Sequence, residues 1–255
     1  MLDKKQHYLQ VALNSNLVEA QSIINQIPLD KRIIIEVGTP LIKAYGIRGI
    51  REIRTWWEQR VFGPAMETAQ FDYSLIGLLS SLAKTSSKKG LPKESLFAPY
   101  IVADLKCMDR GMREVEIAKE GGANALTALG QAPIETLDVF IQKCEEYNLD
   151  AMIDMMNVEF PLGVLRQLKK LPQVVILHRG VDEEETNLEK EIPYHEIQRI
   201  KDNYDIMIAI AGGDDFQEAQ RAIFNDADIV VVWKSFYRST GDTAELARRF
   251  LKEIR

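Results

Sequence analysis

The chain is poor in cysteine and in long apolar runs, and both shortages exclude classes of protein. Only two of its 255 residues are cysteine, Cys107 and Cys144, and they form no CxxC motif. A fold built on disulfides is therefore excluded. No uncharged apolar stretch approaches the ~18 residues that a membrane helix requires. The polar segment 1–7 also lacks the apolar run of a signal peptide. We expect a cytoplasmic protein.

Positive charge is also in the minority. The chain has 32 Lys and Arg against 38 Asp and Glu, a net charge of −6 and a sequence pI near 5.3. Binding to nucleic acid or to a membrane surface usually relies on an excess of positive charge. The sequence therefore predicts no nucleic-acid partner and no membrane partner. Its composition, 46% hydrophobic and 27% charged, is that of an ordinary globular protein.

What the sequence does contain is a regular alternation of short apolar strands and helices. Such alternation indicates a parallel sheet whose strands are buried on both faces. Eight units in about 250 residues match a closed (β/α)8 TIM barrel, with its active site at the carboxyl ends of the strands. An open doubly wound sheet is the alternative, but no dinucleotide glycine motif follows the first strand. Strands are predicted at 8–13, 32–37, 100–106, 124–129, 150–155, 173–177, 205–210 and 228–232.

One segment fits no strand–helix unit. Residues 61–99 combine an apolar helical patch with a polar, lysine-rich loop. We predict a single barrel domain over 1–255, with an inserted helical segment at about 61–99 between the second helix and the third strand. The acidic run 182–185 is predicted to be a solvated loop.

The third predicted strand ends in the sequence Asp104-Leu105-Lys106-Cys107-Met108-Asp109. Side chains alternate between the two faces of a strand, so Asp104 and Lys106 share one face with Val102. An acid and an amine therefore emerge together at a strand end, with Asp109 just past the turn. A structural ion pair would explain Asp104 and Lys106 alone. The second acid favours a catalytic cluster.

Other strand ends carry groups that a barrel would bring to the same mouth. Glu36 repeats the pattern of Asp104, and their carboxylate oxygens suit Mg²⁺. Lys106 beside acids would stay protonated and supply fixed positive charge to a substrate that develops negative charge. His178 lies at a predicted strand end and is the candidate for proton transfer. The alternatives are an ion pair between Glu36 and Lys43, and a structural role for His178.

The remaining strand ends supply candidates for substrate binding. The last two strand ends of barrels commonly hold phosphate on backbone N–H groups, and glycine lets the backbone come close. The glycine pair in this chain could equally form an ordinary tight turn. The predicted substrate-binding residues are Asn14, Asp154, Arg179, Gly212, Gly213 and Lys234.

Several of these motifs together resemble one enzyme family. The chain is similar to the orotidine 5'-phosphate decarboxylase suprafamily, and within it to the 3-hexulose-6-phosphate synthases. The resemblance covers essentially the whole chain except 61–99. The motifs that carry it are LQVAL at 9–13, EVGTPLIK at 36–43, VADLKCMD at 102–109, HRGVD at 178–182 and IAIAGG at 208–213.

This resemblance implies a homodimeric barrel that acts on a sugar phosphate, with Mg²⁺ near Glu36 and Asp104. The implied activity is a lyase reaction that joins formaldehyde to ribulose 5-phosphate, or reverses that step, through an enediolate. Lys106 and Mg²⁺ would hold the enediolate oxygens, and His178 would move the proton at C1. Asp109 would reach into the neighbouring subunit's site. Decarboxylation of 3-keto-gulonate 6-phosphate, also through an enediolate, is the alternative activity.

The chain departs from the family pattern at three places. Asn14 stands where the family has an Asp, segment 61–99 has no counterpart, and Trp233-Lys234 replaces a pair such as Gly-Gly or Gly-Arg. Lys234 could hold a phosphate with its ammonium, or Trp233 could fill the pocket while Lys234 points to solvent. A second function therefore stays open, in which a diverged barrel binds another phosphorylated ligand, or a protein, without this activity.

Overall fold

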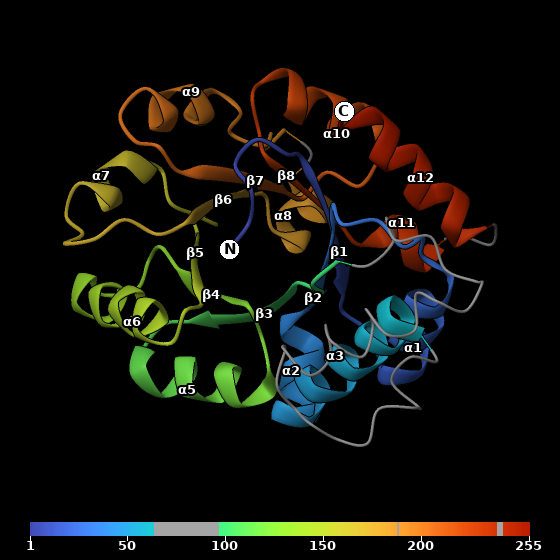
Figure 1. The fold of residues 1–255 in the computed structure, drawn as a ribbon. Coiled ribbons are helices and arrows are strands. Elements are labelled where there is room, and N and C mark those ends of the chain that lie inside the picture. The colour runs from blue at the N-terminus through green and yellow to red at the C-terminus, as the bar shows by residue number, and fades with distance from the viewer. Residues whose placement is uncertain (64–96, 188, 239–241) are drawn as a thin grey trace.

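The computed structural model describes residues 1–63, 97–187, 189–238 and 242–255. Its parallel strands form a closed barrel in which each strand pairs with the next and β8 pairs with β1 (Figure 1). The predicted (β/α)8 barrel is confirmed, and the open sheet is excluded because its edge strands would stay unpaired. The strands are β1 (Tyr8–Leu13), β2 (Ile33–Val37), β3 (Ile101–Cys107), β4 (Ala125–Leu129), β5 (Asp150–Asp154), β6 (Val174–His178), β7 (Met207–Ala211) and β8 (Ile229–Val232).

Helices surround the ring of strands (Figure 1). Several begin at a residue whose side chain caps the first turn. Asn16 and Asp215 each accept the backbone N–H three residues on, from Glu19 and Glu218, and so satisfy a donor that the first turn leaves free. The helices are α1 (Leu17–Gln26), α2 (Thr39–Tyr45), α3 (Ile47–Phe62), α5 (Gly111–Gly121), α6 (Ile134–Glu146), α7 (Pro161–Leu165), α8 (Val181–Thr186), α9 (His195–Lys201), α10 (Phe216–Phe224), α11 (Lys234–Arg238) and α12 (Thr243–Glu253).

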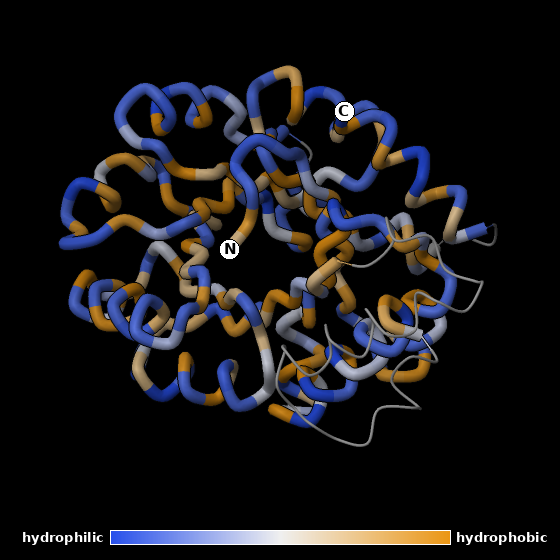
Figure 2. Tube along the Cα trace, in the orientation of Figure 1, coloured by the Kyte–Doolittle hydropathy of each residue, from blue (hydrophilic) through white to orange (hydrophobic). Residues whose placement is uncertain are grey.

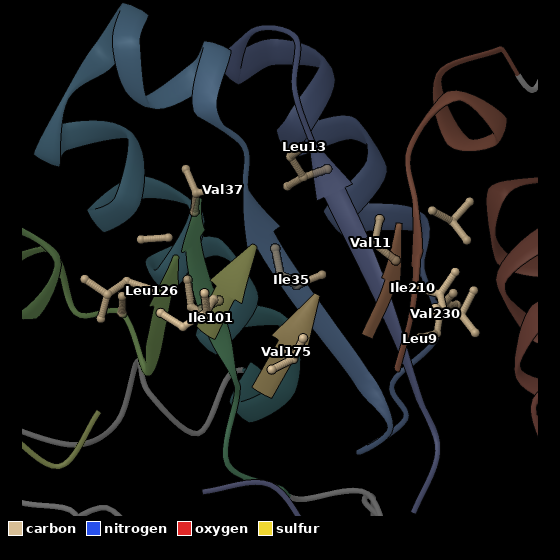
Figure 3. Close-up of a cluster of buried hydrophobic side chains, with 14 of the residues drawn as sticks. Leu9, Val11, Leu13, Ile35, Val37, Ile101, Leu126, Val175, Ile210 and Val230 are labelled. Atoms are coloured by element: carbon tan, nitrogen blue, oxygen red, sulfur yellow. The ribbon is translucent and has the colours of Figure 1, made fainter. Parts of the chain in front are cut away.

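Alternation along the strands divides the buried side chains into an outer and an inner core. Leu9, Val11 and Leu13 lie on the outer face of β1 and belong to the large cluster between the strands and the helices (Figure 3). Figure 2 shows the apolar colour on the strands and a mixture of both colours on the helices, as expected for helices with one buried face. The inner core fills the barrel with Tyr8, Ile34, Val102, Ala125, Met152, Val174, Ile176, Met207, Ala209, Ala211 and Ile229.

Farther along the strands, the same inward face changes from apolar to polar. Ile34 is followed by Glu36 on β2, Val102 by Asp104 on β3, and Met152 by Asp154 on β5. The apolar part fills the barrel, so the polar groups are held at its carboxyl-terminal mouth.

The structure differs from the sequence analysis in two places, and a third prediction falls mostly outside the described residues. The prediction of a loop at 182–185 is wrong, because these acidic residues lie in α8. Thr39-Pro40 opens an unpredicted helix, α2, since proline costs no hydrogen bond in a first helical turn. The predicted insertion at 61–99 begins inside α3, and most of it lies outside the described residues. Within the described ranges, no helix has the length and apolar character needed to cross a membrane.

Candidate active site

A cavity of about 370 Å³ opens at the carboxyl ends of the strands. Its volume is in the range of small-molecule sites. Every strand of the barrel contributes a side chain or a strand-end residue to its lining, so the barrel brings together groups that are more than two hundred residues apart in sequence. Ten of the eleven residues predicted for catalysis, substrate and metal lie in or beside this cavity. Gly213 and Lys234 line an adjoining depression. The cavity itself is lined by Asn14, Glu36, Asp104, Lys106, Asp154, His178, Arg179 and Gly212.

Asp104 is held by hydrogen bonds to both of its carboxylate oxygens. Thr39 donates to Oδ2 and Thr127 donates to Oδ1, each at 2.7 Å, and the Lys106 ammonium lies 3.2 Å from Oδ1. The two hydroxyls come from α2 and β4, on either side of β3. They fix the plane of the carboxylate, which is 7% exposed.

Lys106 is placed by an irregularity in β3. The register with β4 shifts between Ala103 and Cys107, and Lys106 adopts a φ of 48°, which is unusual for a residue with a side chain. Thr127 accepts the Lys106 backbone N–H at 3.0 Å and so supports this conformation. Backbone strain of this kind clusters at functional sites. This backbone conformation lets the Lys106 ammonium reach Asp104 on β3 and Asp154 on β5.

The second acid that Lys106 reaches is Asp154, at 2.8 Å between Nζ and Oδ2. Burial disfavours the ammonium, but the charges of Asp154 and Asp104 outweigh it and raise the pKa of Lys106. Lys106 therefore carries a permanent positive charge between two carboxylates. The structure supports the expectation that this side chain stays protonated.

Asp154 also binds His178, whose Nδ1 lies 2.8 Å from the same oxygen, Oδ2. Burial would raise the pKa of Asp154, but His178 and Lys106 outweigh it and hold that pKa well below its usual value. Burial likewise opposes the charged imidazole, yet Asp154 raises the pKa of His178. Because a carboxylate only accepts hydrogen bonds, Nδ1 carries a proton and Nε2 is the nitrogen left for a ligand.

Glu36 is buried beside these groups, with 7% of its surface exposed. Burial and the negative charge of Asp104 raise its pKa from 4.5 to about 7. Its Oε2 accepts a hydrogen bond of 2.5 Å from Nε2 of Gln10, which lies deeper in the barrel on β1. The predicted alternative of a Glu36–Lys43 ion pair does not occur, since Lys43 makes no salt bridge to Glu36 in the described part of the chain.

The donors around Glu36 fit a hydrated divalent cation. Among the described residues, no three or more His, Cys, Asp and Glu side chains are grouped to hold a metal by themselves. The cavity instead offers two carboxylates, Glu36 and Asp104, whose repulsion a cation would relieve. It also offers the amide oxygen of Gln10, which is buried and has no hydrogen-bond partner among the residues that the structure describes. One or two carboxylates and several waters are the usual surroundings of Mg²⁺.

Three predicted substrate-binding residues lie at the rim between neighbouring loops. A Cβ on Gly38 would lie 1.6 Å from Oδ1 of Asn14, so glycine is needed there for Asn14 to lie against this loop. Arg179 donates from Nη2 to the carbonyl oxygen of Gly212 at 2.7 Å. Gly212 has a φ of 97°, and a Cβ there would lie 2.2 Å from the Arg179 carbonyl oxygen. Arg179 and Gly212 thus join the β6 and β7 loops.

Lys234 lies outside the main cavity and is already paired. Its ammonium donates to Oε2 of Glu184 at 2.8 Å and lies 3.3 Å from Oε1 of Glu185, both on α8. The side chain is buried, so it does not point to solvent. Next to it, Trp233 lines the cavity. The backbone N–H groups of Trp233 and Lys234 each donate to the carboxylate of Asp214 at 2.8 Å.

Asp109 is the one predicted catalytic residue that the fold places away from the cavity. It is exposed, its Oδ1 accepts the Arg110 backbone N–H at 2.7 Å, and it borders a groove beside α5 and α6. Within the described residues it forms no hydrogen bond or ion pair with Lys106 or His178 of its own chain.

Sequence reasoning missed four residues that hold the site together. Gln10 and Thr127 are polar side chains on the inward face of predicted strands, and that pattern could have identified them. Thr39 lies inside the EVGTP motif but received no role. No sequence pattern could have identified Asp214, because its partners are the backbone N–H groups of residues about twenty positions away.

Comparison with known proteins agrees with this geometry. Residues 84–250 match the model of the orotidine 5'-phosphate decarboxylase / HUMPS family, which is more than half of the chain. The chain belongs to this family. The match includes β3 to β8, and with them Asp104, Lys106, Asp154 and His178. The sequence resemblance to this family is therefore confirmed.

Several proteins are similar to this chain over almost its whole length. A bifunctional enzyme Fae/Hps of Methanothrix thermoacetophila is 30% identical over 250 residues, which cover 97% of this chain and 53% of that protein. The chain thus spans about half the length of the curated relatives it matches. The crystal structure of 3-hexulose-6-phosphate synthase from Salmonella typhimurium has a TM-score of 0.74 at 22% identity, with 97% and 98% of the two chains covered. The structure of 3-keto-L-gulonate-6-phosphate decarboxylase from Vibrio cholerae has a TM-score of 0.63 at 17% identity, with 98% and 97% covered.

Proposed function

We propose that the chain is a Mg²⁺-dependent lyase of sugar phosphates, which joins formaldehyde to ribulose 5-phosphate or reverses that reaction. The observation that carries this proposal is the partly buried chain of charges Asp104–Lys106–Asp154–His178 at the mouth of the barrel. It places a fixed cation and a histidine with one free nitrogen on the same wall. Proton removal from the carbon beside a carbonyl needs both groups.

The residues divide the chemistry between them. His178, oriented by Asp154, takes a proton from C1 of ribulose 5-phosphate through Nε2 and can return one later. The carbonyl oxygen at C2 gains negative charge as the proton leaves, and the Lys106 ammonium stabilises that charge. The enediolate carbon then forms a bond to the carbon of formaldehyde, whose oxygen takes up a proton. Atoms and charge balance without an oxidant or a reductant.

Glu36 and Asp104 are the residues that would hold Mg²⁺. The ion would supply a second positive charge for the oxygens of the substrate. Asp104 already accepts from Thr39, Thr127 and Lys106, so its orientation is set before any ligand arrives. Lys106 lies closer to Asp154, at 2.8 Å, than to Asp104, at 3.1 Å, so Asp154 would hold it in place if Asp104 bound the ion.

A second candidate is decarboxylation of 3-keto-gulonate 6-phosphate. It is favoured by the structural similarity to a decarboxylase with that substrate in its name. Loss of carbon dioxide would leave the same type of enediolate beside Lys106, and His178 would then deliver a proton instead of removing one. The two activities differ in substrate and share the site.

The first prediction is a metal-dependent condensation. Formaldehyde should be consumed in the presence of ribulose 5-phosphate and Mg²⁺, the activity should disappear in EDTA, and excess Mg²⁺ should restore it. Release of carbon dioxide from 3-keto-L-gulonate 6-phosphate, measured alongside, distinguishes the second candidate. Full turnover in EDTA would show that the reaction needs no metal. The absence of turnover with either substrate would contradict the proposed function.

The phosphate of the substrate would lie at the β7 and β8 ends, near Gly212. In this chain Asp214 occupies the N–H groups of Trp233 and Lys234. A phosphate that used these donors would have to displace the carboxylate, and Lys234 would exchange Glu184 for the phosphate. Inorganic phosphate should then inhibit competitively with ribulose 5-phosphate; noncompetitive or absent inhibition would place the phosphate elsewhere.

We further propose a homodimer in which Asp109 completes the neighbouring subunit's site. Asp109 is exposed and lies near Met108 and Met112, two apolar side chains that are 45% and 51% exposed. The second prediction is therefore complementation: inactive Asp109→Ala mixed with inactive Lys106→Ala should regain part of the activity, because a hybrid dimer contains one intact site. If no activity returns although subunit exchange has been demonstrated, Asp109 does not contribute to the neighbouring subunit's site.

A further inference from the structure

Gln10 is an uncharged polar side chain that lies deeper in the barrel than the charged group it contacts, Glu36. It is on the inward face of β1, paired in register with Ile34 of β2 and Val231 of β8, and only 1% of it is exposed. Its neighbours on this face are mostly apolar. A buried amide in such surroundings is costly unless both of its ends find partners.

Only one end of this amide has a partner. Nε2 donates to Oε2 of Glu36, whereas Oε1 has no donor among the described residues. An unsatisfied buried acceptor destabilises the folded state, because it has lost its hydrogen bonds to water without replacing them. The unpaired atom belongs to a residue that lines the cavity, beside the carboxylate suited to a cation. Both observations point to a ligand that brings an O–H donor, such as a water bound to a metal ion.

We propose that Gln10 is a positioning residue, which fixes the Glu36 carboxylate for a divalent cation and accepts a hydrogen bond from a water of that cation. The inference rests on the proposed function, because it assumes that the cavity takes up a divalent ion. Partners behind a metal ligand typically change metal affinity 10–100-fold when they are removed. Gln10 lies behind Glu36 in this sense. Its Nε2 donates to Oε2 of Glu36, the carboxylate that would bind the metal, from the side away from the cavity mouth.

The third prediction concerns Gln10→Met, which keeps the length of the side chain and removes both hydrogen-bonding atoms. Mn²⁺ titrated into the metal-free protein should bind about 10–100-fold more weakly than to the wild type. The rise in Tm on adding Mn²⁺ should shrink accordingly. Gln10→Asn, which keeps the amide but is too short to reach Glu36, should show the same loss if Gln10→Met folds poorly. Gln26→Met on α1 is the matched control, because Gln26 is exposed and its side-chain hydrogen bonds within the described part of the chain go to Ser22.

The outcomes separate positioning from a purely structural role. A lower Tm of metal-free Gln10→Met together with Mn²⁺ affinity within twofold of wild type would overturn the inference. A wild-type protein that binds no Mn²⁺ would overturn it as well. The proposed function is judged separately: wild-type condensation of formaldehyde with Mg²⁺, together with unchanged Mn²⁺ affinity in Gln10→Met, would leave the reaction standing and remove Gln10 from it.

Discussion

Replacing His178 with asparagine is expected to lower kcat for the proposed condensation by roughly 10²–10⁴-fold, the usual contribution of a positioned acid–base group. The asparagine amide can still donate to Asp154, so the acid keeps a partner and the fold should be retained. What is lost is the nitrogen that would carry the C1 proton. Steady-state consumption of formaldehyde measures the effect, and circular dichroism checks the fold.

The matched control is His195→Asn, the same change at a histidine outside the cavity. The His195 side chain is 68% exposed and lies near Glu196 on α9. It should leave kcat unchanged. A His178→Asn variant that turns over at the wild-type rate would show that His178 has only a structural role, and the proton transfer would then need another group.

Replacing Asp154 with alanine is expected to give the largest loss of stability, roughly 3–5 kcal/mol, the cost of breaking a buried ion pair by removing one partner. Asp154 is 1% exposed, and its loss leaves Lys106 and His178 without their shared carboxylate oxygen. Chemical denaturation at neutral pH, with the free energy of unfolding extrapolated to water, measures the difference.

The pH dependence of this difference follows from the lowered pKa of Asp154. A carboxyl whose pKa falls on folding contributes stability above its unfolded value, here about 3.8, and loses that contribution as the pH falls further. Wild type and Asp154→Ala should therefore converge in stability as the pH drops below that value. Asp205→Ala is the control, because Asp205 forms an exposed pair with Lys4 and such pairs contribute about 0–1 kcal/mol. If both variants lost the same free energy of unfolding, the charge network around Asp154 would not stabilise the fold more than an exposed ion pair does.

The sequence predicted the barrel well because the signal for its strands is local. Strand β1 was predicted over 8–13 and is observed at Tyr8–Leu13. Alternation within β3 and β5 correctly placed Asp104 and Asp154 on the same inward face as Val102 and Met152. Period-2 patterning depends on neighbouring residues alone, so a single sequence suffices for it.

The details of the site depended on contacts that no local pattern encodes. The position of the Lys106 ammonium follows from a left-handed backbone conformation and from Asp154 two strands away. The pairing of Lys234 follows from α8, which places Glu184 beside it where the sequence predicted a loop. Both features are set by packing between segments that are about fifty residues apart.

The central claim is that this cavity forms an enediolate from a sugar phosphate through His178. Exchange of the C1 protons of ribulose 5-phosphate in D₂O, followed by proton NMR without formaldehyde, tests that step alone. The account predicts that the wild-type protein exchanges a C1 proton for deuterium and that His178→Asn does so at least about 10²-fold more slowly. No exchange by a folded, Mg²⁺-supplied wild-type protein, or equal exchange by the variant, would contradict it.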